Sequence, residues 1–194
     1  MSLHFTRSLD RRLTIEKARS MPTAMKQLYE RSFPAEERRP QAALDAAIAS
    51  ESIDLWLIQA DGADIGFLTI HALPSGVNYI EHFAVEDSMR GSGVGSAALS
   101  LMSAMNPGPM VLEAEPAGTN PMAARRIGFY RRLGFELWDR YPYIQPAYAP
   151  GLDSPELRLM TRGIPADSDI HALATEIRRE VYGAPEQAIN DADA

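Results

Sequence analysis

Residues 79–96 combine residue types that can bind phosphate with a carboxylate that could accept a proton. An arginine is followed by three glycines that alternate with small residues, in the segment Arg90, Gly91, Ser92, Gly93, Val94, Gly95 and Ser96. Glycines let a phosphate approach the backbone closely. The first N–H groups of a following helix have no intrahelical acceptor, so they can bind an anion with help from the helix dipole. The spacing therefore indicates a backbone cradle for phosphate.

Three interpretations of this glycine segment compete. A P-loop requires a lysine directly after its glycines, and none follows here. A dinucleotide-binding turn is closer, because Glu113 and Glu115 end a candidate strand about 20 residues later. However, residues 86–90 separate the glycines from the preceding strand, and Ser96 stands where that fingerprint has Gly or Ala. The third interpretation is a glycine-rich turn that binds nothing.

A strand and a helix flank the cradle. Period-2 alternation over 79–85 predicts a strand, and helical spacing of apolar residues predicts a helix from about Gly93 to Met105. The alternation places four residues on one face of this strand, namely Tyr79, Glu81, Phe83 and Val85. It places Ile80, His82 and Ala84 on the other.

A second stretch, residues 123–136 (AARRIGFYRRLGFE), forms a two-part motif together with the glycine segment. With it the chain resembles the GNAT superfamily of acyl-CoA-dependent N-acetyltransferases, as a bacterial-type subgroup. The family pattern R/Q-x-x-G-x-G/A is met by Arg90, Gly93 and Gly95. The pattern Y-x-x-x-G-F is met by Tyr130, Gly134 and Phe135. The order and separation of the two also match, and the resemblance covers roughly residues 13–162.

The resemblance implies an acetyl-CoA donor and direct transfer, in a ternary complex, to a primary amine of a small molecule or peptide. It assigns cofactor binding to Phe83, Ala84, Val85, Arg90, Gly91, Ser92, Gly93, Val94, Gly95, Ser96 and Asn120. Many members carry an asparagine one or two helical turns before the tyrosine. The position seven residues before Tyr130 is Ala123 in this chain, and Asn120 lies one helical turn earlier. A catalytically idle acyl-CoA-binding regulatory module is the alternative function.

Acyl transfer to an amine requires a base for the amine and an acid for the departing thiolate. Tyr130 suits the acid, because a tyrosine pKa of about 10 keeps it protonated while a thiol of about 8.5 departs. Glu81 is the predicted base, since the alternation places it beside Phe83 and Val85. Glu113 and Glu115 are rivals, and pairing with Arg125 or Arg126 is their structural alternative. The resemblance implies that N–H groups near Phe83 polarise the thioester carbonyl.

Composition limits the remaining functions. A net charge of −7 argues against general nucleic-acid affinity. The chain has no cysteine and four scattered histidines without ligand spacing, so we expect no metal. It shows no signal peptide and no apolar run that could span a membrane, which favours a cytoplasmic location.

The remaining pattern predicts an α+β fold: a mixed, mostly antiparallel twisted sheet of six to seven strands with one central parallel pair, flanked by helices. The expected strands cover 13–18, 53–60, 65–73, 79–85, 110–115, 135–143 and 157–161. Helices are expected after Pro22, after Pro40, over 121–133 and over 167–182. Strands 79–85 and 110–115 should be the parallel pair, because a helical crossover joins parallel neighbours. Arg38 and Arg39 could meet an acidic acceptor, but an exposed basic pair is the favoured interpretation.

We divide the chain into an acetyltransferase-like domain (1–162), a C-terminal helical appendage of that domain (163–183) and a tail without regular structure (184–194). The apolar face of the last helix carries no polar group that the chemistry could use. That face should therefore pack on the domain or on a second copy in a homodimer.

Overall fold

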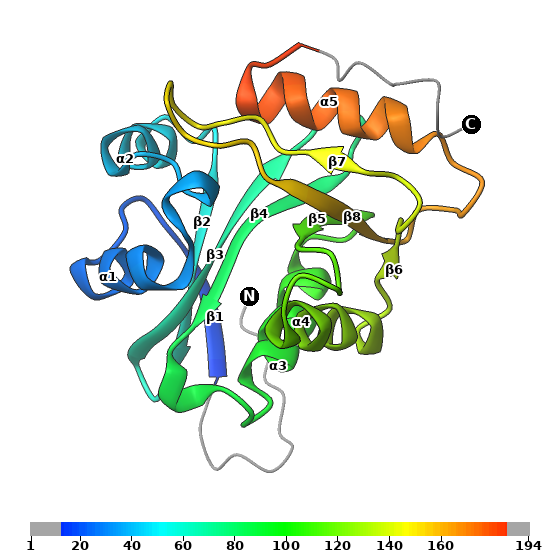
Figure 1. Cartoon of the computed structure of the whole chain (residues 1–194). Helices are drawn as coiled ribbons and strands as arrows, with labels where there is room; N and C mark the ends of the chain where they lie inside the picture. Colours follow the sequence, from blue (N-terminus) through cyan, green and yellow to red (C-terminus); the bar gives the residue numbers. More distant parts are fainter. Residues whose placement is uncertain (1–12, 186–194) are drawn as a thin grey trace.

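The computed structural model describes residues 13–185 of the chain, so the predicted tail falls almost wholly outside the described residues. Its centre is a twisted sheet with the strand order β1-β2-β3-β4-β5-β8-β6, and β7 pairs separately with β8 (Figure 1). The strands are β1 Leu13–Ala18, β2 Asp54–Ala60, β3 Ala63–Ala72, β4 Asn78–Val85, β5 Met110–Ala114, β6 Glu136–Leu137, β7 Tyr143–Ile144 and β8 Glu156–Arg162. Only β4 and β5 pair in parallel among the described strands. The predicted fold class is confirmed.

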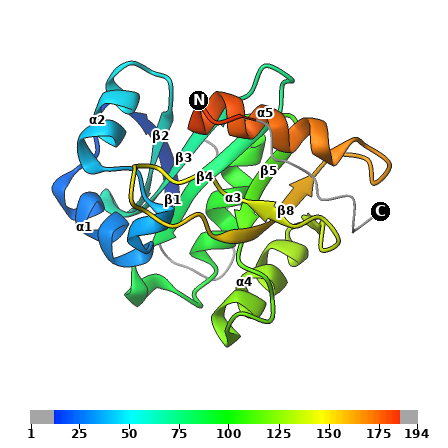
Figure 2. The same ribbon diagram turned by 45° about the horizontal axis from the view of Figure 1, so that its top comes forward.

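Helices cover both faces of the sheet. They are α1 Thr23–Ser32, α2 Gln41–Ala49, α3 Val94–Met105, α4 Pro121–Arg132 and α5 Ile170–Tyr182, with short 3₁₀ turns η1 Ala35–Glu37 and η2 Asp87–Met89. One apolar cluster joins α3 and α4 to one face of the sheet. A second cluster joins α1 and α2 to the opposite face, and a third joins α5 to that same face. Figures 1 and 2 show α5 lying across the end of the molecule, with α3 and α4 on the other side of the sheet.

The parallel pair opens into a fork. β4 and β5 are paired at only three positions, the last being Ile80 with Leu112. β4 continues to Val85 without β5 beside it. Beyond this point no strand pairing separates the α3–α4 side of the sheet from the α5 side. Groups from both sides can therefore reach a molecule inserted in the gap.

A β-bulge changes the expected faces of β4. The β3–β4 register shifts between Thr69 and Ile70, which face His82 and Ile80, and this leaves Glu81 as the extra residue. Such a residue interrupts the alternation of side chains. Phe83 and Val85 pack toward α3, whereas Glu81 contacts groups on the α1 and α5 face. The prediction that Glu81 shares a face with them is wrong.

Two boundaries also differ from the predictions. The expected strand 135–143 forms two short strands, β6 and β7, because residues 139–142 turn, with the Tyr141 N–H donating to the Trp138 carbonyl. The sheet therefore has eight strands in the described part of the chain. The last helix begins at Ile170 rather than at 167, since Asp169 caps its first N–H groups. Gly134 ends α4 with a φ of 83°, as predicted.

No helix within residues 13–185 is both long and apolar enough to cross a membrane.

Candidate active site

The glycine segment lies directly before and within the first turn of α3. Gly91 and Gly93 have φ angles of 77° and 87°, which glycine adopts without the strain that a side chain adds. Within the described chain, the backbone N–H groups of residues 91–96 have no backbone acceptor. They can therefore donate to an anion at the positive end of the helix dipole.

The neighbours of these glycines shape the cradle. Arg90 is about half exposed, and its Nη2 lies 2.8 Å from Asp87 Oδ1. The Ser92 hydroxyl donates to the Met89 carbonyl. Val94 is buried, whereas Ser96 lies in the first turn and its carbonyl accepts from Ser100. Arg90 is thus held at the rim, where its charge adds to that of the helix terminus.

Gly95 faces two aromatic rings. A Cβ added there would lie 3.4 Å from Phe129 Cζ and 3.5 Å from Phe83 Cζ. The two rings stack with centroids 6.4 Å apart. These contacts connect the cradle to the unpaired end of β4, where Val85 also faces α3, while Ala84 packs toward α1.

Tyr130 occupies the α3–α4 side of the fork. Its ring packs edge-on against Phe129 and Phe135, with centroids 5.1 and 5.6 Å away. Burial raises the pKa of Tyr130 to about 12. The hydroxyl therefore stays protonated at neutral pH. Because it donates to no protein group within residues 13–185, it is free to donate to a ligand.

Asn120 and Glu115 have structural partners. Asn120 caps α4, with its Oδ1 accepting from the Ala123 N–H at 2.8 Å and its Nδ2 donating to Glu115 at 3.2 Å. Arg126 Nη1 lies 3.2 Å from the other oxygen of Glu115. This pairing matches the structural alternative weighed for Glu115 in the sequence.

Glu81 lies at the fork, directly after the last β4 position paired with β5. Its side chain is fully buried and both carboxylate oxygens have donors. Arg39 Nε donates to Oε1 at 2.7 Å, as does the Tyr148 hydroxyl at 2.8 Å. His71 Nε2 donates to Oε2 at 3.1 Å. Burial would raise the pKa of Glu81, but the hydrogen bond from His71 and the neighbouring His82 and Arg39 outweigh it and hold the pKa well below its usual range.

Glu113 lies opposite Glu81, directly after the last paired position of β5. The Tyr182 hydroxyl donates to its Oε2 at 3.0 Å. Its buried Oε1 has no hydrogen-bond partner in the part of the chain that the structure describes. The Tyr143 hydroxyl influences Glu113 electrostatically but does not reach hydrogen-bond geometry. Burial raises the pKa of Glu113 to about 7, although the neighbouring tyrosine hydroxyls lower it.

Two tyrosines join these carboxylates. The hydroxyl oxygens of Tyr148 and Tyr182 lie 3.4 Å apart. The Tyr79 hydroxyl oxygen lies 2.9 Å from that of Tyr182. The fork is therefore lined on the α5 face by a hydrogen-bonded chain that runs from Glu81 through Tyr148 and Tyr182 to Glu113.

The apolar face of α5 packs on the domain, and Tyr182, one residue beyond that face, points into the fork. One sequence prediction about this region is wrong. Arg39 is not part of an exposed pair, because its side chain is only 16% exposed and its Nη2 also donates to the Val181 carbonyl at 2.8 Å. Sequence spacing carried no signal for Arg39, His71 or Tyr182, which come together only through tertiary packing.

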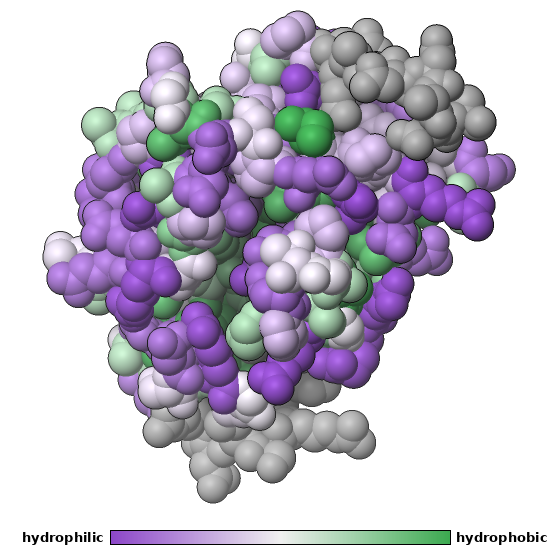
Figure 3. Space-filling model, in the orientation of Figure 1, coloured by the Kyte–Doolittle hydropathy of each residue, from purple (hydrophilic) through white to green (hydrophobic). Residues whose placement is uncertain are grey.

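The surface over the fork is hollowed. Figure 3 shows a recess with hydrophobic walls between the α1 side and the α4 side of the molecule, rimmed by hydrophilic residues. The loop between β7 and β8, which carries Tyr148, extends toward the α1–α2 connection in Figures 1 and 2. There Gln145 Nε2 donates to the Glu36 carbonyl at 3.1 Å. This contact holds the β7–β8 loop against the α1–α2 connection.

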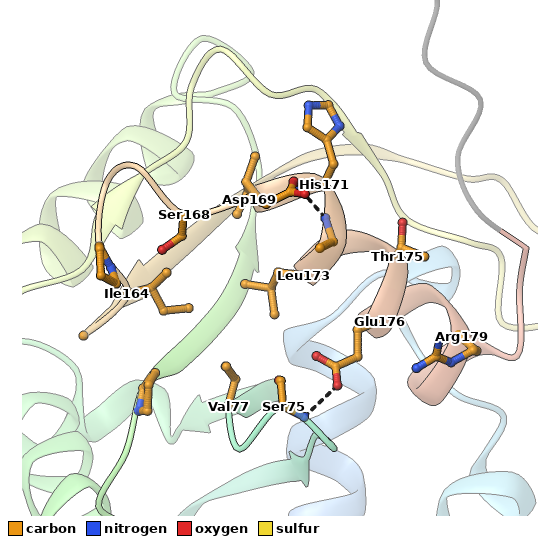
Figure 4. A pocket seen from close by; sticks show the side chains of 15 residues that line it. Ser75, Val77, Ile164, Ser168, Asp169, His171, Leu173, Thr175, Glu176 and Arg179 are labelled. Atoms are coloured by element: carbon orange, nitrogen blue, oxygen red, sulfur yellow. Dashed lines mark hydrogen bonds between the residues drawn. The ribbon is translucent and has the colours of Figure 1, made fainter.

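A second hollow, of about 720 Å³, lies elsewhere, between the N-terminal half of α5 and the loops before β4 and β5. In Figure 4 Glu176 points to Ser75 across its floor, and Asp169 caps the helix at its edge. None of the residues of the cradle or the fork lines it, so it is not the candidate active site.

Comparisons with known proteins agree with this geometry. A sequence model of the acetyltransferase (GNAT) domain matches residues 51–137. A solved structure assigned to the GNAT family, from Bacteroides thetaiotaomicron, is 34% identical, with a TM-score of 0.76 over 83% of this chain and 91% of the other. No curated protein matches the chain.

More distant structures share the fold alone. An acetyltransferase from Salmonella typhimurium that modifies the N-terminal serine of ribosomal protein L7/L12 is 17% identical, with a TM-score of 0.59 over 79% of this chain and 95% of the other. A GNAT acetyltransferase from Elizabethkingia anophelis with acetyl-CoA bound is 16% identical, with a TM-score of 0.52 over 78% and 98%. Together with the 34% identity over most of both chains, these findings show that the chain belongs to the GNAT family of acetyltransferases.

Proposed function

We propose that this protein transfers the acetyl group of acetyl-CoA to a primary amine of a small molecule or peptide, directly, in a ternary complex. The observation that carries the proposal is the fork between β4 and β5. It has an anion cradle and a tyrosine on its α3–α4 side and two carboxylates on its α5 side. A donor and an acceptor can therefore meet in the gap from opposite faces of the sheet.

The donor would lie on the α3–α4 side. The free N–H groups of residues 91–96 would hold the pyrophosphate of acetyl-CoA, with Arg90 adding positive charge. The thioester would enter the fork beside Phe83, where the unpaired backbone of β4 can donate to its carbonyl oxygen. The distant relative with acetyl-CoA bound supports this choice of donor.

Tyr130 would act as the acid. The thiolate of a thiol with a pKa of about 8.5 is a weaker base than the Tyr130 phenolate, yet a positioned tyrosine can protonate the thiolate as the C–S bond breaks. Retention of this hydroxyl, together with carboxylates at the fork, favours an enzyme over an idle acyl-CoA-binding module. Glu81 is the base expected from the sequence, and Glu113 is its rival.

A thiol-release assay tests the proposal. The protein would be incubated with acetyl-CoA and a panel of primary amines and N-terminal peptides, with Tyr130→Phe as the matched variant. Calorimetry with acetyl-CoA and with NAD would run in parallel. Binding of acetyl-CoA without release by any amine would support the idle module. Micromolar binding of NAD would revive the dinucleotide interpretation.

A further inference from the structure

The two carboxylates at the fork differ in what surrounds them. Glu81 and Glu113 each follow the last paired position of their strand, so both border the same gap. Glu81 accepts from Arg39, His71 and Tyr148. These donors stabilise the ionised form and occupy both of its oxygens, which makes Glu81 a weak base.

Glu113 keeps one oxygen free. Its Oε2 accepts from Tyr182, while Oε1 is buried without a partner among residues 13–185. An unpartnered buried acceptor costs about 1–3 kcal/mol, so such atoms in a folded protein call for an explanation. A ligand N–H placed in the fork would supply the missing donor.

We propose that Glu113 is the group that takes the proton from the acceptor amine, and that Tyr182, at the end of the C-terminal helix, positions it. The inference rests on the proposed function. It gives α5 a part in the site beyond covering the sheet, and it assigns Glu81 to anchoring Arg39 and Tyr148.

The proton and electron balance is complete without another reactant. Glu113 takes one proton from the ammonium group and frees the nitrogen lone pair. This pair forms the C–N bond with the thioester carbonyl carbon while the C–S bond breaks. The thiolate takes the Tyr130 proton, and the Tyr130 phenolate regains the proton that the new amide nitrogen loses. Glu113 then releases its proton to water.

Several ionisable groups surround Glu113. Tyr79 and Glu81 face it from β4, Tyr143 from β7, Tyr148 from the β7–β8 loop and Tyr182 from α5. Burial raises the pKa of Tyr79, Tyr148 and Tyr182 well above the usual range, so these hydroxyls do not titrate near neutrality. Arg39 and Glu81 remain a charged pair there. Glu113, with its pKa of about 7, is thus the group of this set whose charge changes around neutral pH.

The experiment compares Glu113→Gln, Tyr182→Phe and the parent, with Tyr141→Phe as the control, because Tyr141 packs on His171 at the other end of α5. kcat/KM would be measured from pH 5.5 to 9.5 on a confirmed amine, and acetyl-CoA affinity by calorimetry. Glu113→Gln should lower kcat/KM by about 10²-fold or more and abolish its rise through neutrality, with acetyl-CoA affinity unchanged. Tyr182→Phe removes a bond that favours the ionised form, so the rise should move to higher pH. Tyr141→Phe should behave as the parent.

A second measurement needs no activity. A carboxyl whose folded pKa is raised stabilises the fold below its unfolded pKa of about 4.3 and loses that contribution as pH rises through the folded value. Relative to Glu113→Gln, the parent should therefore lose thermal stability between about pH 5 and pH 7.

The outcomes separate the two proposals. Parental kcat/KM in Glu113→Gln, or a stability difference that does not change with pH, would overturn the assignment of Glu113 while leaving acetyl transfer intact. A parent that releases no thiol with any amine would overturn the proposed function, and the base role with it, even if the pH-dependent stability difference were observed.

Discussion

Replacing Gly93 by alanine should weaken acetyl-CoA binding far more than its effect on stability would suggest. Gly93 has a φ of 87°, and a Cβ there meets no atom within 4 Å. The loss of stability therefore arises from backbone strain alone, about 1–2 kcal/mol for a residue in the left-handed region. For a chain of this size that corresponds to a fall in Tm of about 2–8 °C. The new methyl group also enters the open space in which a pyrophosphate would lie.

Binding should fall by about 10- to 100-fold, because displacing one charge-assisted hydrogen bond costs about 1.5–3 kcal/mol. Gly62 provides the matched control. It lies in the β2–β3 turn with a φ of 81° and no atom near its missing Cβ. Gly62→Ala should lose similar stability but bind acetyl-CoA as the parent does. Calorimetry would measure acetyl-CoA affinity and thermal denaturation would measure stability in both variants. Unchanged binding in Gly93→Ala would place the cradle elsewhere. Equal losses of affinity in both variants would show that the effect follows from lost stability and not from the cradle.

Three further changes give separate tests. Tyr130→Phe should lower kcat by about 10²-fold with little change in acetyl-CoA affinity, and raising the pH should not restore it; parental kcat would make the hydroxyl a packing feature. Glu81→Gln leaves Arg39 buried without its charge partner, which should cost about 3–5 kcal/mol at pH 7. Because the folded pKa of Glu81 is lowered, this deficit should shrink below about pH 4, and recovery of activity at high pH would instead mark Glu81 as the base. Gly66→Ala should severely destabilise the fold, since its Cβ would lie 2.5 Å from the Ala84 carbonyl oxygen; a Tm within 2 °C of the parent would contradict this packing.

The sequence predicted the donor side of the site well, because that side depends on local patterns. The glycines, the helix that follows them and Gly134 act through their own backbone angles, which leave a signature in residue type. The parallel pairing of β4 and β5 also followed from one local rule, the helical crossover between them. The free N–H groups of the cradle are a direct consequence of these local choices.

The acceptor side was predicted less well, since it depends on tertiary contacts. One bulge in β4 turned Glu81 away from Phe83 and Val85, and alternation alone cannot detect an inserted residue. Arg39, His71 and Tyr182 come from a loop, a strand and a helix end that are far apart in the sequence. No spacing rule connects them.

The same bulge explains why the two carboxylates have different roles available to them. By directing Glu81 to the α1 and α5 face, it brings that side chain to Arg39 and His71, whose donors keep it ionised. Glu113 follows regular alternation on β5, so it points to the same face, and among residues 13–185 only Tyr182 donates to its carboxylate and no cation pairs with it. If β4 alternated regularly from Glu81 to Phe83 and Val85, Glu81 would lie with them on the α3 face, away from Arg39 and from Glu113. The inserted residue therefore gives the two carboxylates different surroundings, and on our proposal Glu81 is the anchor and Glu113 is the group that exchanges a proton.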